Sequence, residues 1–148
     1  IYRLNLQGFR NYFLYTELDN IMQALIVAAH GSRLNASNEE VKLLSQHLYK
    51  RLRTRYSILN TGFLELAEPS IPEAIIQCIQ KGGTDIKVLP YFLSAGQHVQ
   101  NDLPNEIEKV ENTYPDIKIT LLSYIGGMSN FSDFICDYAE LEATDVSV

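Results

Sequence analysis

The stretch ALIVAA, residues 24–29, decides the fold of this 148-residue chain, and His30, Gly31 and Ser32 follow it directly. A short apolar run without polar interruptions is typical of a strand that is buried on both faces. Such strands belong to parallel sheets, whose two faces are covered by helices. The run therefore predicts the central strand of an α/β domain, and this strand ends at a histidine.

Three further strand patterns follow, and a helical pattern separates each strand from the next. The later strands are expected at residues 57–64, 86–91 and 117–124. Ser37 with Glu40, and Ser70 with Glu73, have the spacing of a capping box and predict the starts of the first two helices. Strands that alternate with helices through short connections predict an open, mainly parallel four-stranded sheet with helices on both faces.

Two more helices are expected in the second half of the chain. One begins near Asn101 or Asp102 and has Pro104 in its first turn, where a missing backbone N–H leaves no helical hydrogen bond unmade. The last helix has apolar residues at helical spacing, and we expect it to bury them. These residues are Phe131, Phe134, Ile135 and Tyr138.

Polar residues follow the first three predicted strands. His30 comes directly after the first strand, Glu65 after the second, and His98 lies in the loop after the third. The carboxyl ends of parallel strands meet at one edge, where open α/β sheets bind their ligands, so we expect one shared site. Two imidazoles and a carboxylate suit iron, cobalt, nickel or zinc, and they can also accept protons near neutral pH. The residues alone leave both roles open.

Composition and missing motifs exclude several other classes of protein. The formal charge of -6 argues against a nucleic-acid-binding surface, and no apolar run is long enough to span a membrane. Neither GxGxxG nor GxxxxGK[ST] occurs, so neither a dinucleotide site nor a P-loop is expected. We expect no organic cofactor. Cys78 and Cys136 lie in helical apolar stripes, which predicts buried free thiols in a reducing compartment. We therefore expect a cytoplasmic protein without a nucleic-acid or membrane partner.

Residues 1–21 differ from the rest of the chain. Polar residues interrupt every apolar run in this segment, so it has no signal-peptide core. Met22 stands directly before the first strong strand. We interpret residues 1–21 as an N-terminal extension that contributes little to the core, and residues 22–148 as one α/β domain.

Three segments resemble the conserved blocks of the small CbiX-type sirohydrochlorin chelatases, in the same order and spacing. They are VAAHGSRLNASNEEV (27–41), GFLELAEPSIPEAI (62–75) and VLPYFLSAGQHVQNDLP (88–104). The third is the most specific, because it joins PxFLxxGxH to a following DxP. The resemblance implies insertion of divalent cobalt or iron into sirohydrochlorin on the path to cobalamin or siroheme. We expect cobalt as the metal, with iron or nickel as alternatives. The resemblance implies that His30 and His98 bind the metal and that Glu65 takes part in catalysis.

The resemblance also leads to expectations about substrate and partners. Ser32, Arg33, Ser94 and Gly96 are candidate substrate-binding residues, although ordinary loop contacts are an open alternative for them. Larger relatives carry two such domains, so a homodimer is the natural inference for this chain. Two alternative functions stay open, namely a siroheme ferrochelatase and a non-enzymatic carrier of metal or tetrapyrrole.

Overall fold

The structure, a computed structural model, describes residues 21–144. The expected N-terminal extension lies outside the described residues except for Ile21, so its role stays a prediction. Strands and helices alternate along the described part. They are β1 (Gln23–Ala29), α2 (Asn35–Leu52), β2 (Ile58–Phe63), α3 (Ile71–Gln80), β3 (Asp85–Pro90), α4 (Leu103–Thr113), β4 (Lys118–Leu121) and α5 (Phe131–Thr144). Two short turns, η1 (His98–Asp102) and η2 (Ile125–Gly127), precede α4 and α5.

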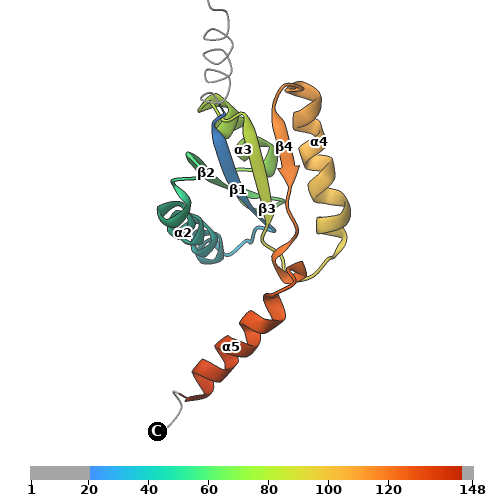
Figure 1. The fold of residues 1–148 in the computed structure, drawn as a ribbon. Helices are drawn as coiled ribbons and strands as arrows, with labels where there is room; N and C mark the ends of the chain where they lie inside the picture. The colour runs from blue at the N-terminus through green and yellow to red at the C-terminus, as the bar shows by residue number, and fades with distance from the viewer. Residues whose placement is uncertain (1–20, 145–148) are drawn as a thin grey trace, which may run out of the picture.

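The four strands form one parallel sheet in the order β2-β1-β3-β4 (Figure 1). β1 pairs with β2 on one side and with β3 on the other, and its residues 24–29 are all buried. The continuous apolar run therefore forms the central strand that the sequence predicts. Because all strands run in one direction, the segments that follow β1, β2 and β3 leave the sheet at the same edge.

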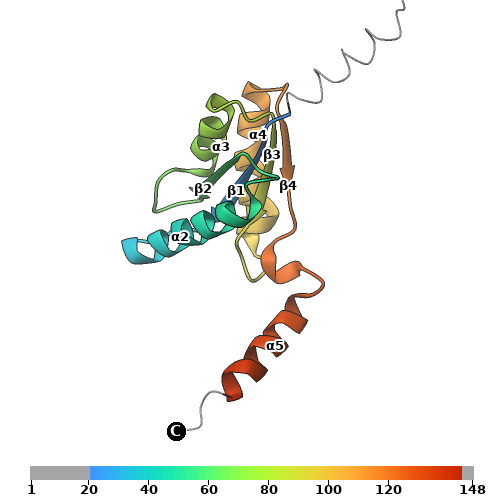
Figure 2. The same ribbon diagram turned by 60° about the vertical axis from the view of Figure 1, so that its left-hand side comes forward.

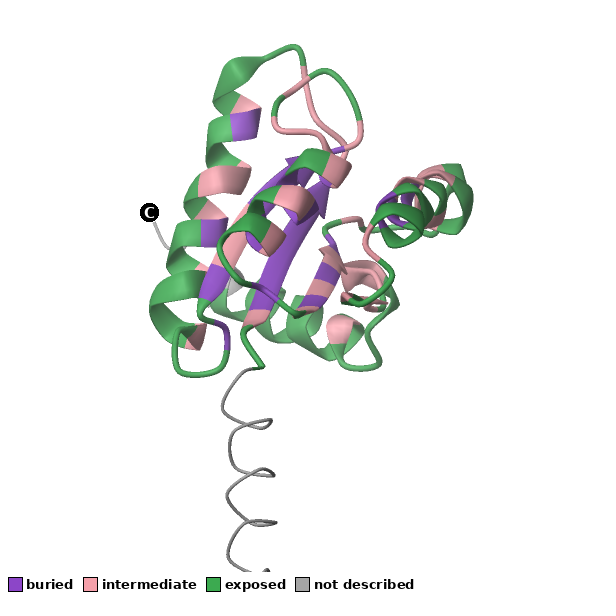
Figure 3. Ribbon diagram, turned by 90° about the horizontal axis from the view of Figure 1, so that it is seen from above, coloured by how far each residue is buried: buried purple, intermediate pink, exposed green. Residues whose placement is uncertain are grey.

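Helices α3 and α4 pack side by side on one face of the sheet. Ile26, Ile75 and Ile86 are completely buried in the core that they share with the strands. Gly62 allows α3 to lie close to β2, since a Cβ atom there would come within 2.9 Å of the Ile71 Cα. Figure 3 shows that the buried positions gather in the strands and on the sheet-facing sides of the helices. This close-packed half fixes the strand ends that carry the polar residues.

Helix α2 covers the opposite face, mainly over β2, so helices lie on both faces as predicted. A buried polar contact joins this helix to β2, in which the Thr61 hydroxyl donates to the Ser45 hydroxyl at 2.7 Å. The expected capping box of Ser37 and Glu40 is wrong. The helix begins at Asn35 without a side-chain cap, two residues before Ser37. The capping box of Ser70 and Glu73, in contrast, is present at the start of α3.

Within residues 21–144, the last helix leaves three of its four predicted core residues exposed and Phe131 half-buried, which corrects the expectation from the sequence. Phe134, Ile135 and Tyr138 are exposed, and Cys136 is exposed as well. Figures 1 and 2 show that α5 runs away from the sheet beyond η2. The fourth strand is also shorter than predicted and ends at Leu121. No helix in residues 21–144 combines the length and apolar character needed to cross a membrane.

Candidate functional site

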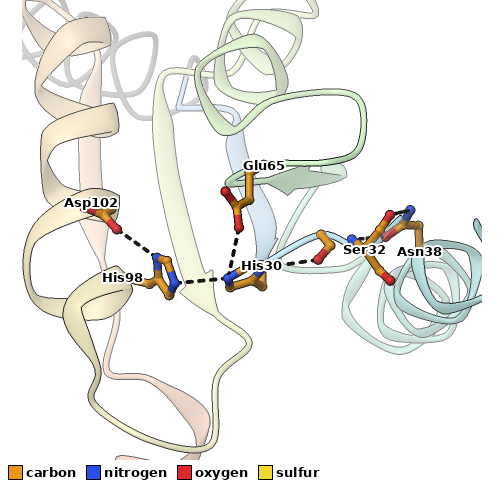
Figure 4. A network of polar contacts seen from close by, with 7 residues as sticks. His30, Ser32, Asn38, Glu65, His98 and Asp102 are labelled. Atoms are coloured by element: carbon orange, nitrogen blue, oxygen red, sulfur yellow. Dashed lines mark hydrogen bonds and ion pairs between the residues drawn. The ribbon is translucent and has the colours of Figure 1, made fainter. Parts of the chain in front are cut away.

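The ends of the first three strands bring together His30, Glu65 and His98, as the sequence predicts (Figure 4). The Nε2 atoms of His30 and His98 lie 3.0 Å apart. The Glu65 Oε1 atom lies 3.4 Å from the same His30 nitrogen. The two rings meet edge to face, with centroids 4.4 Å apart. Both imidazoles and the carboxylate therefore converge on one point at the sheet edge.

Gly31 makes this convergence possible. Its φ of +93° lies in the left-handed region, and a Cβ atom at this position would come within 1.8 Å of the Glu65 carbonyl oxygen. The backbone segments after β1 and β2 stay paired here, because the Glu65 N–H donates to the His30 carbonyl at 3.0 Å. Only glycine combines this backbone angle with such a close approach. The residue after the histidine therefore keeps His30 and Glu65 side by side.

His98 lies in the first turn of η1, not in an irregular loop as expected. This turn is π-helical and leads directly into α4, and such turns are often found at functional sites. One turn later along the chain, Asp102 Oδ2 accepts a hydrogen bond from His98 Nδ1 at 2.8 Å. From the sequence, Asp102 is expected only at the start of a helix. The four-residue spacing between a histidine and an aspartate was the signal that could have identified this pair.

The hydrogen bonds of the His30 and His98 rings indicate which nitrogen of each imidazole carries a proton. The Asp102 carboxylate and the Gly31 carbonyl can only accept, so each ring uses its Nδ1–H in these contacts, which are 2.8 Å and 3.2 Å long. Two neutral imidazoles carry one N–H each. Their Nε2 atoms then face each other at 3.0 Å as two lone pairs. A proton or a metal cation between the two nitrogens removes this repulsion.

The site is open to solvent on one side. Between 42% and 53% of the His30, His98 and Glu65 side chains is exposed. Within residues 21–144, no three acidic, histidine or cysteine side chains are arranged as a ready metal-binding group. A hollow of about 360 Å³ adjoins His98, Glu65 and Asp102, and Lys109 lies at its wall. Another hollow, of about 440 Å³, lies at the outer edge of β2 and contains none of the site residues.

Glu68, which lies close to Glu65 in the sequence, belongs to a different contact. Its carboxyl group interacts with the Glu73 carboxylate, and this hydrogen bond and the neighbouring negative charge raise the pKa of Glu68. The Ser70 N–H and hydroxyl hold the pKa of Glu73 below its usual value. These carboxyl groups serve the start of α3, so Glu65 is the carboxylate of the β2–α3 connection that faces the histidines.

The four candidate substrate-binding residues lie on loops beside the site. Ser32 is held by backbone and side-chain contacts at the start of α2, since its N–H donates to Asn38 at 2.9 Å and its hydroxyl accepts from the Leu34 N–H at 3.1 Å. Arg33, Ser94 and Gly96 are exposed. Their substrate contacts therefore stay predictions, and the contacts of Ser32 are those of a turn.

Comparison with known proteins identifies the family. The CbiX family model matches residues 24–140. A sirohydrochlorin cobaltochelatase of Methanocaldococcus jannaschii is 34% identical over 63% of this chain and 64% of its own length. A sirohydrochlorin ferrochelatase of Priestia megaterium is 33% identical over 66% of this chain and 36% of its own length.

A solved structure of SirB from Bacillus subtilis with Fe³⁺ is 26% identical and has a TM-score of 0.76. The match covers 86% of this chain and 48% of that one. The chain thus spans between about a third and two thirds of the length of these relatives. The matching blocks include the strand ends that carry both histidines and Glu65. The chain therefore belongs to the CbiX family.

Proposed function

We propose that this chain is a sirohydrochlorin chelatase that inserts a divalent metal ion into the tetrapyrrole, with cobalt favoured and iron or nickel as alternatives. The observation that carries the proposal is the 3.0 Å contact between His30 Nε2 and His98 Nε2, beside the Glu65 carboxylate. Two nitrogens at this separation, each about 2.1 Å from one ion, would subtend about 90° at that ion. This is the angle between two neighbouring ligands of an octahedral ion, whose other positions stay open for the substrate.

In this proposal the metal ion is a substrate. His30 and His98 each offer an Nε2 lone pair, and these nitrogens replace water molecules that the ion must lose before it enters the macrocycle. Asp102 is a positioning residue, because it holds the Nδ1–H of His98 and so leaves Nε2 as the free ligand atom. The open side of the site allows the ion to leave toward the macrocycle.

The reaction also releases two pyrrole N–H protons, which need an acceptor. Glu65 is 53% exposed and lies 3.4 Å from His30 Nε2, so its carboxylate can accept a proton on the same side as the metal. Sirohydrochlorin carries several carboxylates, and Arg33 and Lys109 supply positive charge near the site. Ser32, Ser94 and Gly96 are proposed to contact the macrocycle edge.

The proposed assembly is a homodimer. Residues 21–144 contain one four-stranded sheet with its helices, whereas the match covers only 48% of SirB. Two copies of the chain would supply the two domains between which a macrocycle can lie.

Catalytic turnover tests the proposal. The protein is mixed anaerobically with excess sirohydrochlorin and with cobalt, iron or nickel separately, while the macrocycle absorption is followed. We expect many insertions per chain, with cobalt fastest. Binding of one macrocycle per chain without further turnover would instead identify a carrier. Fastest turnover with iron would identify a siroheme ferrochelatase.

A further inference from the structure

Each connection that leaves the histidine edge of the sheet exposes a large apolar side chain. These four residues, which we call the apolar rim, are between 42% and 73% exposed. They are Leu34 after β1, Leu66 after β2, Leu93 after β3 and Met128 after β4. In the described chain, the three helix-to-strand connections at the opposite edge, residues 53–57, 81–84 and 114–117, expose no large apolar side chain. Scattered exposed apolar residues are common on proteins, but this arrangement at one edge indicates a binding surface.

Leu66 adopts a backbone conformation that leucine normally avoids. Its φ of +62° lies in the left-handed region, and within residues 21–144 it is the only residue other than glycine with a positive φ. Glycine and asparagine adopt this conformation at a lower cost than leucine. Burial does not explain the leucine, because 51% of it is exposed. Backbone strain of this kind is concentrated at functional sites, so we expect the Leu66 side chain to contact a ligand.

The loop around Leu66 is fixed on both sides, which maintains the left-handed conformation. Before Leu66, the Glu65 N–H donates to the His30 carbonyl at 3.0 Å. After it, the Pro69 carbonyl accepts from the Phe63 N–H at 2.9 Å. The Glu65 carboxylate lies 3.4 Å from His30 Nε2 (Figure 4). An exposed leucine is therefore held directly beside the group of side chains that forms the candidate site.

Leu93 combines the most exposed side chain of the apolar rim with a tightly packed backbone. A Cβ atom on Gly126 would lie 1.8 Å from the Leu93 carbonyl oxygen, and the Gly126 N–H donates to the Phe92 carbonyl at 3.0 Å. The connections after β3 and β4 therefore support each other at the histidine edge. Side chains on such a fixed backbone lose little conformational entropy on binding, so they are preorganised for a contact.

A flat ring with apolar faces and a charged periphery matches this surface. A macrocycle that receives a metal ion from His30 and His98 must turn one face toward their Nε2 atoms. In that position the ring lies over the ends of the strands, where the apolar rim offers contacts to its face. Its peripheral carboxylates need cations instead, and the exposed Arg33 directly precedes Leu34.

We infer that Leu66 and Leu93 contact the face of the tetrapyrrole and position it over the two histidines. This contact accounts for a leucine at a left-handed position of the loop after β2. The inference rests on the proposed function for the identity of the ligand. It assigns recognition of the ring face to apolar side chains, separately from the polar loop residues proposed to contact the ring edge.

Titration of the full chain with sirohydrochlorin in the absence of metal, followed by the macrocycle absorption, tests the contact. Leu66→Asn should raise the sirohydrochlorin dissociation constant about five- to tenfold, because about half of a leucine side chain is available for burial. Leu66→Met keeps an apolar side chain and should bind nearly as tightly as the parent. Leu43→Asn is the matched control, since Leu43 is also 51% exposed but lies in the middle of α2. This control should bind like the parent.

Unfolding in urea separates a ligand contact from a structural role of Leu66. Leu66→Asn should keep or raise the urea midpoint, because asparagine relieves the strain of the left-handed conformation. Leu43→Asn should lower the midpoint, because asparagine is a poor helix former. In the insertion assay, Leu66→Asn should raise KM for sirohydrochlorin, while its cobalt affinity without tetrapyrrole stays at the parent value. Leu93→Asn should show the same loss of sirohydrochlorin binding, and it replaces Leu66→Asn if that variant does not fold.

Three results would overturn the inference. The first is parent-like sirohydrochlorin binding in Leu66→Asn and Leu93→Asn. The second is a fall in the urea midpoint of Leu66→Asn as large as that of Leu43→Asn, because the leucine would then serve the fold. The third is a change in the mass of these variants in solution without a change in sirohydrochlorin binding, because the apolar rim would then contact another chain.

These measurements also separate the inference from the proposed function. If the parent inserts metal and both rim variants bind sirohydrochlorin like the parent, the face contact is wrong and the chelatase proposal stands. If the predicted binding pattern is found but the parent inserts no metal, the chelatase proposal is wrong and the face contact stands. A parent that does not bind sirohydrochlorin would overturn both.

Discussion

Replacing Asp102 by asparagine tests how the site prepares His98 for a metal ion. The carboxylate accepts from His98 Nδ1 at 2.8 Å and so keeps the proton away from Nε2. Asparagine has the same shape, but its amide can turn and donate to Nδ1, which moves the ring proton to Nε2 and removes the metal ligand. Residues that orient a metal-binding histidine typically contribute 10- to 100-fold in affinity or activity.

The exposure of this pair places the expected effect at the lower end of that range. The His98 and Asp102 side chains are 43% and 42% exposed, so water competes with their hydrogen bond. We therefore expect Asp102→Asn to weaken cobalt binding about tenfold, which corresponds to about 1.4 kcal/mol, and to slow insertion by a similar factor.

Calorimetric cobalt titration and the initial insertion rate measure the two effects, and ¹⁵N NMR of the imidazole nitrogens reports the tautomer of His98. Glu106→Gln is the matched control, because this carboxylate lines the same hollow but bonds to Lys109 and not to His98. Equal effects of Asp102→Asn and Glu106→Gln would refute this role of Asp102, and so would an unchanged His98 tautomer and cobalt affinity in Asp102→Asn.

Three further changes test other parts of the site and the fold. Glu65→Gln should slow metal insertion about 100-fold and weaken cobalt binding much less, because a general base is lost while both imidazoles stay. Initial insertion rates and calorimetric cobalt titrations measure the two effects. Gly31→Ala should lower the free energy of unfolding in urea by about 2 kcal/mol or more, while Gly96→Ala, with open space around its Cβ, should change it little. A thiol reagent at pH 8 should modify the exposed Cys136 and not Cys78, because burial raises the pKa of the Cys78 thiol to about 11 and keeps it protonated. Mass spectrometry locates the labelled cysteine.

Each of these expectations has a contrary result. If cobalt affinity and insertion rate fall together in Glu65→Gln, the carboxylate is a metal ligand, and if neither changes, Glu65 is not part of the site. Equal stability of the two alanine variants would contradict the close approach at Gly31. Rapid labelling of Cys78 in the folded protein would contradict its burial.

The sequence was sufficient for the parts of the fold that depend on local patterns. The apolar run at 24–29 and the capping box at Ser70 report conformations that neighbouring residues determine, and both are present in the structure. The meeting of His30, Glu65 and His98 also followed from topology, because parallel strands end at one edge. These features need no knowledge of side-chain packing.

Other features depend on contacts that no local pattern contains. The capping box at Ser37 fails because Asn38, inside the same turn, holds both the N–H and the carbonyl of Ser32, and the helix begins earlier. The apolar stripe of α5 predicts a buried helix face, yet Phe134, Ile135 and Tyr138 are exposed in the described part of the chain, because the pattern of one helix does not specify a surface that covers it. The role of Asp102 depends on the π-helical turn, which no local sequence pattern predicts here.

We propose that His30 and His98 handle the metal ion together, and turnover by single-histidine variants tests this proposal. His47 provides the control, since it is an exposed histidine on α2 outside the site. Insertion of cobalt into sirohydrochlorin should fall at least about 100-fold in His30→Ala and in His98→Ala and stay at the parent rate in His47→Ala. Parent-like turnover in either His30→Ala or His98→Ala, with the fold intact by circular dichroism, would contradict a shared role of the two histidines.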